Sequence, residues 1–120
     1  MKLSTDDLHK IEQVRAILEN EYRNANTHSH LARRVSTNES KLRKGFKLVN
    51  HKTIYEYLIG VRIKKAKELL ETTDEPVKAI AIRVGYDVSN LVKQFKKTTG
   101  MAPLQWRKIN TPDNTHTFIQ

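Results

Sequence analysis

The chain has 120 residues, enough for one domain or two very small lobes, and 38% of them are apolar. It contains no cysteine, which excludes a disulfide framework, a thiol nucleophile and a cysteine-ligated zinc site. Its formal net charge of +9 and pI near 9.9 indicate a polyanionic partner.

The positive charge is concentrated in residues 27–110, which carry 18 basic and 7 acidic side chains. A basic segment of this kind gains affinity for nucleic acid by releasing condensed counterions. Residues 1–4 lead directly into a charged segment rather than a signal peptide, and no apolar run approaches the ~20 residues of a membrane span. We therefore expect a soluble, intracellular protein with no membrane partner.

The first expected helix begins at Ser4, because the acids at positions 6 and 7 favour the positive end of a helix dipole. Apolar residues then recur at steps of three and four and predict a helix that ends near Asn24. Its apolar positions are Leu8, Ile11, Val14, Leu18 and Tyr22.

Two further helices are expected over residues 28–35 and from residue 39 to about 49. Thr27 is the predicted N-cap of the first and Asn38 of the second, with a tight turn at residues 36–37 between them. The apolar residues expected to face the core are Leu31, Ala32, Val35, Leu42 and Phe46.

The clearest pattern predicts a long helix over residues 54–71, capped by Thr53. At ~1.5 Å per residue it is about 27 Å long, and with packed lobes at its ends it could hold two helices roughly 34 Å apart, which is one turn of B-DNA. Its stripe is apolar except for Arg62, which we interpret as a structural residue that joins the lobes. The stripe consists of Tyr55, Leu58, Ile59, Arg62, Ile63, Ala66, Leu69 and Leu70.

The remaining elements repeat the helix-turn-helix order. A helix is expected over residues 77–84, followed by a turn at Gly85 and a helix from residue 88 to about 99 with Asp87 as its cap. Gly100 ends that helix, and Pro103 begins a last short one. The expected inward positions are Val77, Ile80, Ala81, Val84, Leu91, Phe95, Leu104 and Trp106, the last as core rather than as a platform for a nucleic-acid base.

The predicted fold class is all-α, with about seven helices in two helix-turn-helix lobes joined by a long linker helix. Residues 1–26 hold the N-terminal helix of the first lobe, and residues 27–52 the first helix-turn-helix unit. Residues 53–73 are the linker helix, and residues 74–110 the second unit with its closing helix. Residues 111–120 are polar and are expected to form a disordered tail.

Two stretches, residues 31–47 and 80–96, share one plan. In each, a small alanine on a short helix lets a second helix cross closely, an Asx residue caps that second helix, and apolar anchors lie four residues apart. A single helical hairpin of any function shows two apolar anchors and a charged outer face. Two copies, each with a capped and basic second helix, favour units that read DNA.

The exposed faces of these two helices carry donors that suit the major groove. Arginine and lysine can donate to guanine O6 and N7, asparagine can pair with adenine, and serine can serve either base. The predicted base-reading residues are Ser40, Lys41, Arg43, Lys44, Ser89, Asn90 and Lys93. The predicted contacts to the DNA backbone are Lys47, His51, Lys52, Thr53, Lys96 and Lys97.

An enzymatic function is not expected. The sequence has no phosphate-binding glycine-rich loop, no paired carboxylates in an apolar setting and no nucleophile with an evident base. Its five histidines do not make a metal site, since His28 and His30 would diverge at a helix start. We expect neither a metal nor a cofactor.

The residues resemble the AraC/XylS family of transcriptional regulators over about residues 27–108. The most specific part is the run Arg62, Ala66, Leu69-Leu70, Ile80-Ala81, Val84-Gly85-Tyr86, Phe95-Lys96-Lys97, Gly100, Pro103 and Trp106-Arg107. The sequence departs from the family pattern in the turn before Asp87, which is one residue short. That difference could rotate the second recognition helix.

The resemblance implies a monomeric domain of seven helices in two lobes, whose third and sixth helices read bases in successive major grooves. Its partner would be double-stranded promoter or operator DNA, with RNA polymerase as a further candidate, in the cytoplasm and associated with the nucleoid. Regulators of this family usually also have a sensing or dimerising domain. This chain is therefore either a stand-alone regulator or the DNA-binding part of a longer one.

Two alternatives remain open beside sequence-specific regulation. A basic helical module could bind an acidic protein, in which case duplex DNA would not compete with that partner. A nonspecific nucleic-acid binder would bind scrambled DNA nearly as well as a selected site. The sequence does not indicate the operator, the target genes, an inducer or the sign of regulation.

Overall fold

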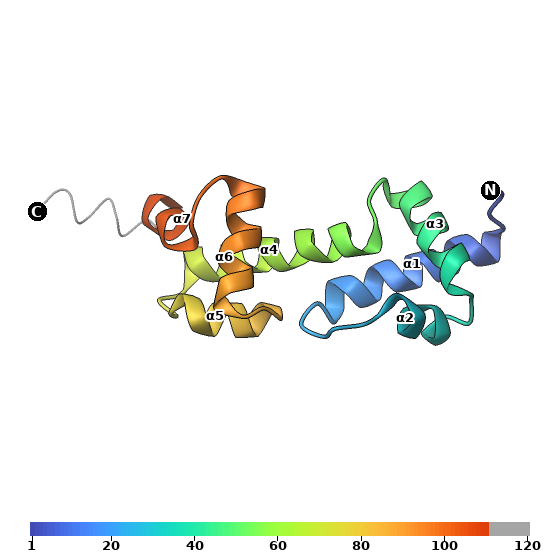
Figure 1. Cartoon of the computed structure of the whole chain (residues 1–120), viewed down its shortest axis with the longest axis horizontal. Helices are drawn as coiled ribbons and strands as arrows, with labels where there is room; N and C mark the ends of the chain where they lie inside the picture. Colours follow the sequence, from blue (N-terminus) through green and yellow to red (C-terminus); the bar gives the residue numbers. More distant parts are fainter. Residues whose placement is uncertain (111–120) are drawn as a thin grey trace, which may run out of the picture. The chain divides into compact units, whose positions relative to one another are not determined.

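A computed structural model describes residues 1–110, which form seven α-helices and, within that range, no β-strand (Figure 1). The prediction of an all-α fold is confirmed. The tail predicted for residues 111–120 lies outside the described residues. The helices are α1 (Thr5–Asn20), α2 (His28–Arg34), α3 (Glu39–Asn50), α4 (Ile54–Thr72), α5 (Val77–Val84), α6 (Val88–Thr99) and α7 (Pro103–Asn110). In this part of the chain, none of the helices is long and apolar enough to cross a bilayer.

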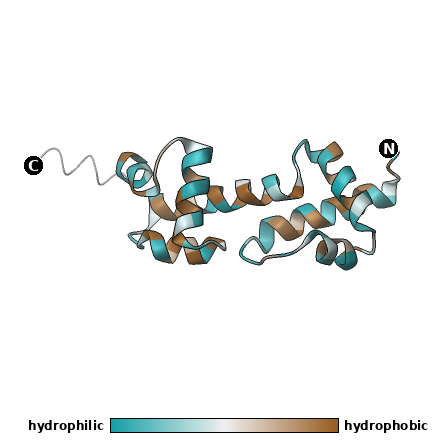
Figure 2. Ribbon diagram, viewed as in Figure 1, coloured by the Kyte–Doolittle hydropathy of each residue, from teal (hydrophilic) through white to brown (hydrophobic). Residues whose placement is uncertain are grey.

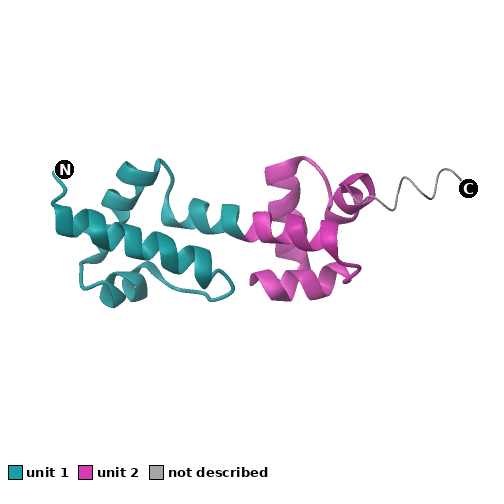
Figure 3. Cartoon of the chain, turned by 180° about the vertical axis from the view of Figure 1, so that it is seen from behind, with its two compact units in different colours: residues 1–61 teal, residues 62–120 magenta. Residues whose placement is uncertain are grey.

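The chain divides into two compact units, residues 1–61 and residues 62–120 (Figure 3). The division falls inside α4, so the first turns of this helix belong to the first unit and its later turns to the second. Each unit contains one helix-turn-helix pair, α2 with α3 in the first and α5 with α6 in the second. The helices α3 and α6 are called the recognition helices below.

The core of the first unit is built from one face of each of its helices. Apolar and polar residues alternate in bands along these helices (Figure 2), as expected where one face of a helix is buried. The buried residues are Ile11, Val14, Leu18, Leu31, Ala32, Val35, Leu42, Phe46 and Ile54, with Leu3, Ile17, Tyr57 and Leu58 packed against them.

The second unit has a core of the same kind. Its buried apolar residues are Ile63, Ala66, Leu70, Ile80, Ala81, Val84, Leu91 and Phe95. Arg62 is buried among them, and its guanidinium carbon lies 4.9 Å from the centre of the Tyr86 ring, a cation–π contact within this unit. That contact fits the structural interpretation of Arg62, whereas its role in joining the lobes stays a prediction.

Three residues predicted to face the core are instead exposed: Leu8 at 45%, Tyr55 at 61% and Leu104 at 62%. In the first turn of α1 the inward position is taken by Asp7, whose carboxylate is bound by neighbouring groups, so Leu8 points aside. In α4 the inward position is taken by Ile54, which is 3% exposed, and the next residue is therefore turned outward by about 100°.

The first helix is also shorter than predicted, because α1 ends at Asn20 rather than near Asn24. The side chain of Asn20 donates to the carbonyl of Ala16, and Glu21 leaves the helix as its C-cap. The Glu21 carboxylate then accepts two hydrogen bonds from Arg34 at 2.8 and 2.9 Å. This bidentate pair connects the end of α1 to the end of α2.

Gly100 is the C-cap of α6 and has a φ of 80°, the left-handed conformation that a Cβ atom disfavours. Gly60 lies exposed inside α4, and a Cβ atom would meet nothing within 4 Å at either glycine. The two positions therefore separate the backbone effect of alanine from steric effects.

We predict that Gly100→Ala lowers the free energy of unfolding by about 1 kcal/mol, because alanine is strained at positive φ. Gly60→Ala should raise it by roughly 0.5–1 kcal/mol through helix propensity. Urea unfolding followed by circular dichroism measures both changes. Equal effects of the two substitutions would contradict the assignment of Gly100 as a left-handed cap.

Candidate nucleic-acid interface

The two helix-turn-helix pairs repeat the same local frame at a spacing of 49 residues. In the first, the N–H of Thr37 donates to the carbonyl of Ala32 at 2.9 Å, and in the second Tyr86 donates to Ala81 at 2.8 Å. The second turn is therefore as long as the first and closes with the same bond. The turn therefore does not distinguish the second unit from the first, whereas the effect of its departure from the family pattern stays a prediction.

Both recognition helices are capped as predicted. The side chain of Asn38 accepts a hydrogen bond from the N–H of Lys41 at 2.7 Å, and that of Asp87 accepts from the N–H of Asn90 at 2.7 Å. The caps satisfy N–H groups that the first turn of a helix leaves without a partner. With two buried anchors four residues apart, they fix which side of each helix faces outward.

On α3 the outward residues lie along the side opposite Leu42 and Phe46. Ser40, Arg43 and Lys44 are exposed, and Lys47 follows one turn later. Within the described residues, Arg43 and Lys44 form no hydrogen bond or ion pair, so their donors are available to a ligand. The structure thus brings these four predicted residues together on one face.

Lys41 is placed differently from the other predicted readers. Its ammonium forms an ion pair with Asp7 of α1 at 2.9 Å. Asp7 is also the third residue of a capping box, since its carboxylate accepts from the N–H of Ser4 at 2.9 Å and the Ser4 hydroxyl accepts from the Asp7 N–H. The Ser4 backbone N–H and the Lys41 side chain lower the pKa of Asp7 from 3.8 to about 2.

A second contact from α1 reaches the turn before α3. The Lys10 ammonium donates to the carbonyl of Ser36 at 2.9 Å and forms an ion pair with Asp6 at 3.0 Å. Ser36 has a φ of 58°, which a residue other than glycine seldom adopts. The beginning of α1 thus holds both the turn and the recognition helix of the first unit.

The outward face of α6 carries the five residues predicted for the second unit, and all of them are exposed: Ser89, Asn90, Lys93, Lys96 and Lys97. The Asn90 amide also donates to Asp87 at 3.3 Å, a long contact that directs the side chain toward the cap. Lys93 has no hydrogen bond or ion pair with any described residue. This face is basic toward the C-terminal end of the helix.

The predicted backbone contacts His51, Lys52 and Thr53 lie in the segment between α3 and α4. His51 is the C-cap of α3 with a φ of 61°, the position that Gly100 holds after α6. Thr53 forms a capping box with Glu56, each accepting from the backbone N–H of the other at 3.0 and 2.8 Å. This bonding lowers the pKa of Glu56, with smaller contributions from Lys47 and Lys52.

An aromatic contact that the sequence did not reveal supports each recognition helix from inside. In the first unit Phe46 meets Tyr57 edge to face with ring centres 5.6 Å apart, and in the second Phe95 meets Trp106 in the same way at 5.8 Å. Both pairs are 11 residues apart in the sequence. The equal spacing of the two pairs is the feature of the sequence that could have indicated these aromatic contacts.

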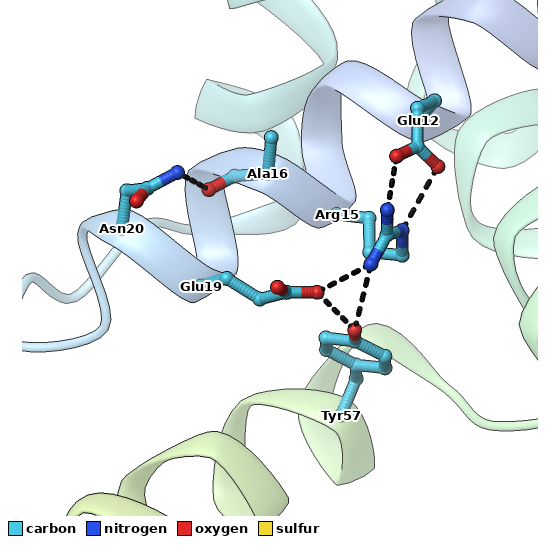
Figure 4. Close-up of polar contacts among 6 residues, drawn as sticks. All are labelled: Glu12, Arg15, Ala16, Glu19, Asn20 and Tyr57. Atoms are coloured by element: carbon cyan, nitrogen blue, oxygen red, sulfur yellow. Dashed lines mark hydrogen bonds and ion pairs between the residues drawn. The ribbon is translucent and has the colours of Figure 1, made fainter.

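In each pair, the ring that lies outside the recognition helix, Tyr57 or Trp106, has its polar atom bound by a glutamate. The Tyr57 hydroxyl donates to Glu19, which also accepts from Arg15 at 2.6 Å (Figure 4). Arg15 lies between Glu12 and Glu19, and the close-up shows all three side chains directed to one another beside Tyr57. Burial and the Glu19 bond raise the pKa of the Tyr57 hydroxyl. In the second unit the Trp106 indole donates to Glu71 at 2.9 Å.

No cluster of three or more histidine, aspartate and glutamate side chains suited to a metal ion occurs among residues 1–110. The arrangement can bind a ligand through exposed donors on two helices, and the groups with described partners serve to hold those helices in place.

Comparison with known proteins agrees with this geometry. Residues 31–109 match the family model described as a helix-turn-helix domain. The HTH-type transcriptional activator RhaR of an Enterobacter species is 37% identical over 70 residues, which cover 58% of this chain and 25% of that protein. The chain spans between 25% and 36% of the length of the first curated relatives it matches.

Two solved structures show the same fold. The C-terminal domain of AraT, a response regulator from Geobacillus stearothermophilus, has a TM-score of 0.82 and 26% identity, covering 92% of this chain and 90% of that one. The DNA-binding domain of AdpA, solved with a target DNA, has a TM-score of 0.79 at 24% identity, covering 83% and 91%.

The Asp7 carboxylate, bound by the Ser4 N–H and paired with Lys41, gives a prediction for the pH dependence of stability. Because the pKa of Asp7 is lowered in the folded chain, its contribution is complete above about pH 4 and is lost as the pH falls toward 2. Between pH 5 and pH 2.5 the urea midpoint of the native chain should fall further than that of Asp7→Asn.

Asp74→Asn is the matched control, since this carboxylate is exposed and forms no ion pair with a described residue. It should retain the pH dependence of the native chain. If Asp7→Asn retains it as well, then the Asp7 carboxylate does not stabilise the folded chain.

Proposed function

The chain belongs to the helix-turn-helix family, as a DNA-binding domain of the AraC type found in transcriptional regulators, and on this premise we propose that it binds a specific duplex site with both units. In this proposal α3 and α6 each enter a major groove, in two successive turns of the DNA. The protein to which the chain belongs would regulate transcription from the promoter that carries the site.

The observation that carries the proposal is the duplicated frame. Two recognition helices have the same cap, the same turn and the same buried anchors, and each presents exposed hydrogen-bond donors at matched positions. A nonspecific binder needs basic charge, but it does not need two helices that are each capped and anchored in the same way and carry serine and asparagine among the lysines.

The roles of single residues follow from their placement. We propose that Ser40, Arg43 and Lys44 of α3, together with Ser89, Asn90 and Lys93 of α6, contact base edges. Contacts to phosphates are proposed for Lys47, His51, Lys52, Thr53, Lys96 and Lys97. Lys41 is paired with Asp7, so we assign it a positioning role and a base contact only if DNA displaces that pair.

The proposed partners are those of a regulator that acts at a promoter. We propose that the domain binds as a monomer, since it contains two reading units of its own, and that it works at the nucleoid. The relative RhaR is named a transcriptional activator, which supports RNA polymerase as a second partner of the whole protein.

Selection of bound duplexes from a random library at about physiological salt tests the proposal. Enrichment of two short motifs about one helical turn apart is the expected result. Binding without enrichment would mean a nonspecific binder. No binding would leave only a module that binds an acidic protein.

We predict that Arg43→Ala and Lys93→Ala each cost about 1–3 kcal/mol of binding free energy on the selected site and relax its preference at one position. Lys52→Ala is the control for a lost charge, and it should at most weaken binding to all sequences alike. Titration of labelled duplexes measures these changes. Unchanged affinity and preference in both helix variants would show that the outward faces of α3 and α6 do not enter the grooves.

A further inference from the structure

The constant spacing between the units allows their recognition helices to be compared residue by residue. Both helices have 12 residues, and both end at a left-handed residue, with a φ of 61° at His51 and 80° at Gly100. Their caps and anchors are also 49 residues apart. Every position on α3 therefore has a defined counterpart on α6 that faces the same way relative to its own unit.

Some matched positions carry equivalent side chains and others do not. The equivalent pairs are Ser40 with Ser89, Lys44 with Lys93, and Lys47 with Lys96. The pairs that differ are Glu39 with Val88, Lys41 with Asn90, Arg43 with Val92, Gly45 with Gln94, Leu48 with Lys97, Val49 with Thr98, and Asn50 with Thr99. Because the frames match, any difference in base preference between the units arises from the second group.

The pair Arg43 and Val92 combines the greatest difference in chemistry with a place on the outward side. Arg43 is exposed and has no hydrogen bond or ion pair with a described residue, so its fork of donors can bind guanine O6 and N7 together. Lys41, the other cation that the second unit lacks, is held by Asp7.

The second unit offers methyl groups in the corresponding place. Val92 is partly exposed, and Val88, one turn earlier on the same side, is 40% exposed. Valine has no donor or acceptor in its side chain, and the apolar group that a base presents in the major groove is the C5 methyl of thymine.

Resting on the proposed function, we infer that Arg43 in the first unit and Val92 in the second set the difference in base preference between the two units. The first unit selects a half-site with a guanine bound by Arg43. The second unit selects one with a thymine whose methyl group packs against Val92, supported by Val88.

An exchange of the two side chains tests this inference by library selection, with the whole chain used throughout. Arg43→Val should reduce the preference for guanine in one motif by about tenfold and leave the other motif unchanged. Val92→Arg should replace thymine by guanine at one position of the other motif.

The controls match the changes in charge. Lys52→Val removes one positive charge outside the recognition helices, and Thr98→Arg adds one on α6 at an exposed position away from Val92. Neither control should alter the motifs. If Arg43→Val only weakens binding to all sequences, as Lys52→Val does, and Val92→Arg brings no guanine, the inference fails while the proposed function stands. If the native chain enriches no motif, the proposed function itself fails.

Modified bases in the selected duplex test the same two contacts without any substitution in the protein. Deoxyuridine in place of the selected thymine removes only the C5 methyl, and the native chain should bind this duplex about fourfold more weakly. The 7-deaza form of the selected guanine removes N7 and should weaken binding of the native chain but not of Arg43→Val. Equal binding of the native chain to all these duplexes would overturn the inference.

Discussion

The orientation of each recognition helix depends on one edge-to-face aromatic contact. Phe46 and Phe95 each lie at the centre of a core, fully buried, with Tyr57 and Trp106 against them. A glutamate then binds the polar atom of each outer ring, which keeps the ring from rotating away. Because each phenylalanine is a buried anchor of its recognition helix, the contact helps to fix which residues of that helix face outward.

Charged side chains that do not belong to the recognition helices support these aromatic contacts. Glu19 is neutralised by Arg15, and a lysine, Lys67, lies over the Trp106 ring with its nitrogen 4.9 Å from the ring centre. Arg107 donates to the carbonyls of Leu70 and Glu75, at the end of α4 and beyond it. The basic side chains thus form two sets. One set makes contacts within the fold, and the other is exposed on the recognition helices, where it can bind a polyanion.

The parts of the fold that the sequence predicted are those set by short-range rules. The caps Thr27, Asn38 and Asp87 bind N–H groups three residues away, so their residue types were sufficient. Lys41 is placed by its ion pair with Asp7, which is 34 residues away in the sequence. The helical periodicity of the sequence does not indicate an ion pair between residues so far apart. Tyr55 was predicted as core because a single stripe was extended through α4, whereas Ile54 fills the first core. Which outward residues touch bases depends on DNA, and neither the sequence nor the fold determines it.

The sharing of α4 between the two units links their folding. The stretch that remains to either unit, residues 54–61 or 62–72, is shorter than the ~12–15 residues at which an isolated helix begins to be marginally stable in water. Each half of α4 is therefore stabilised by packing against the core of its own unit. When one unit melts, its half of α4 loses that packing, and the half in the other unit is left with an end whose backbone groups lack helical partners. The boundary between the two units is consequently a continuous turn of helix, through which the stability of one unit affects that of the other.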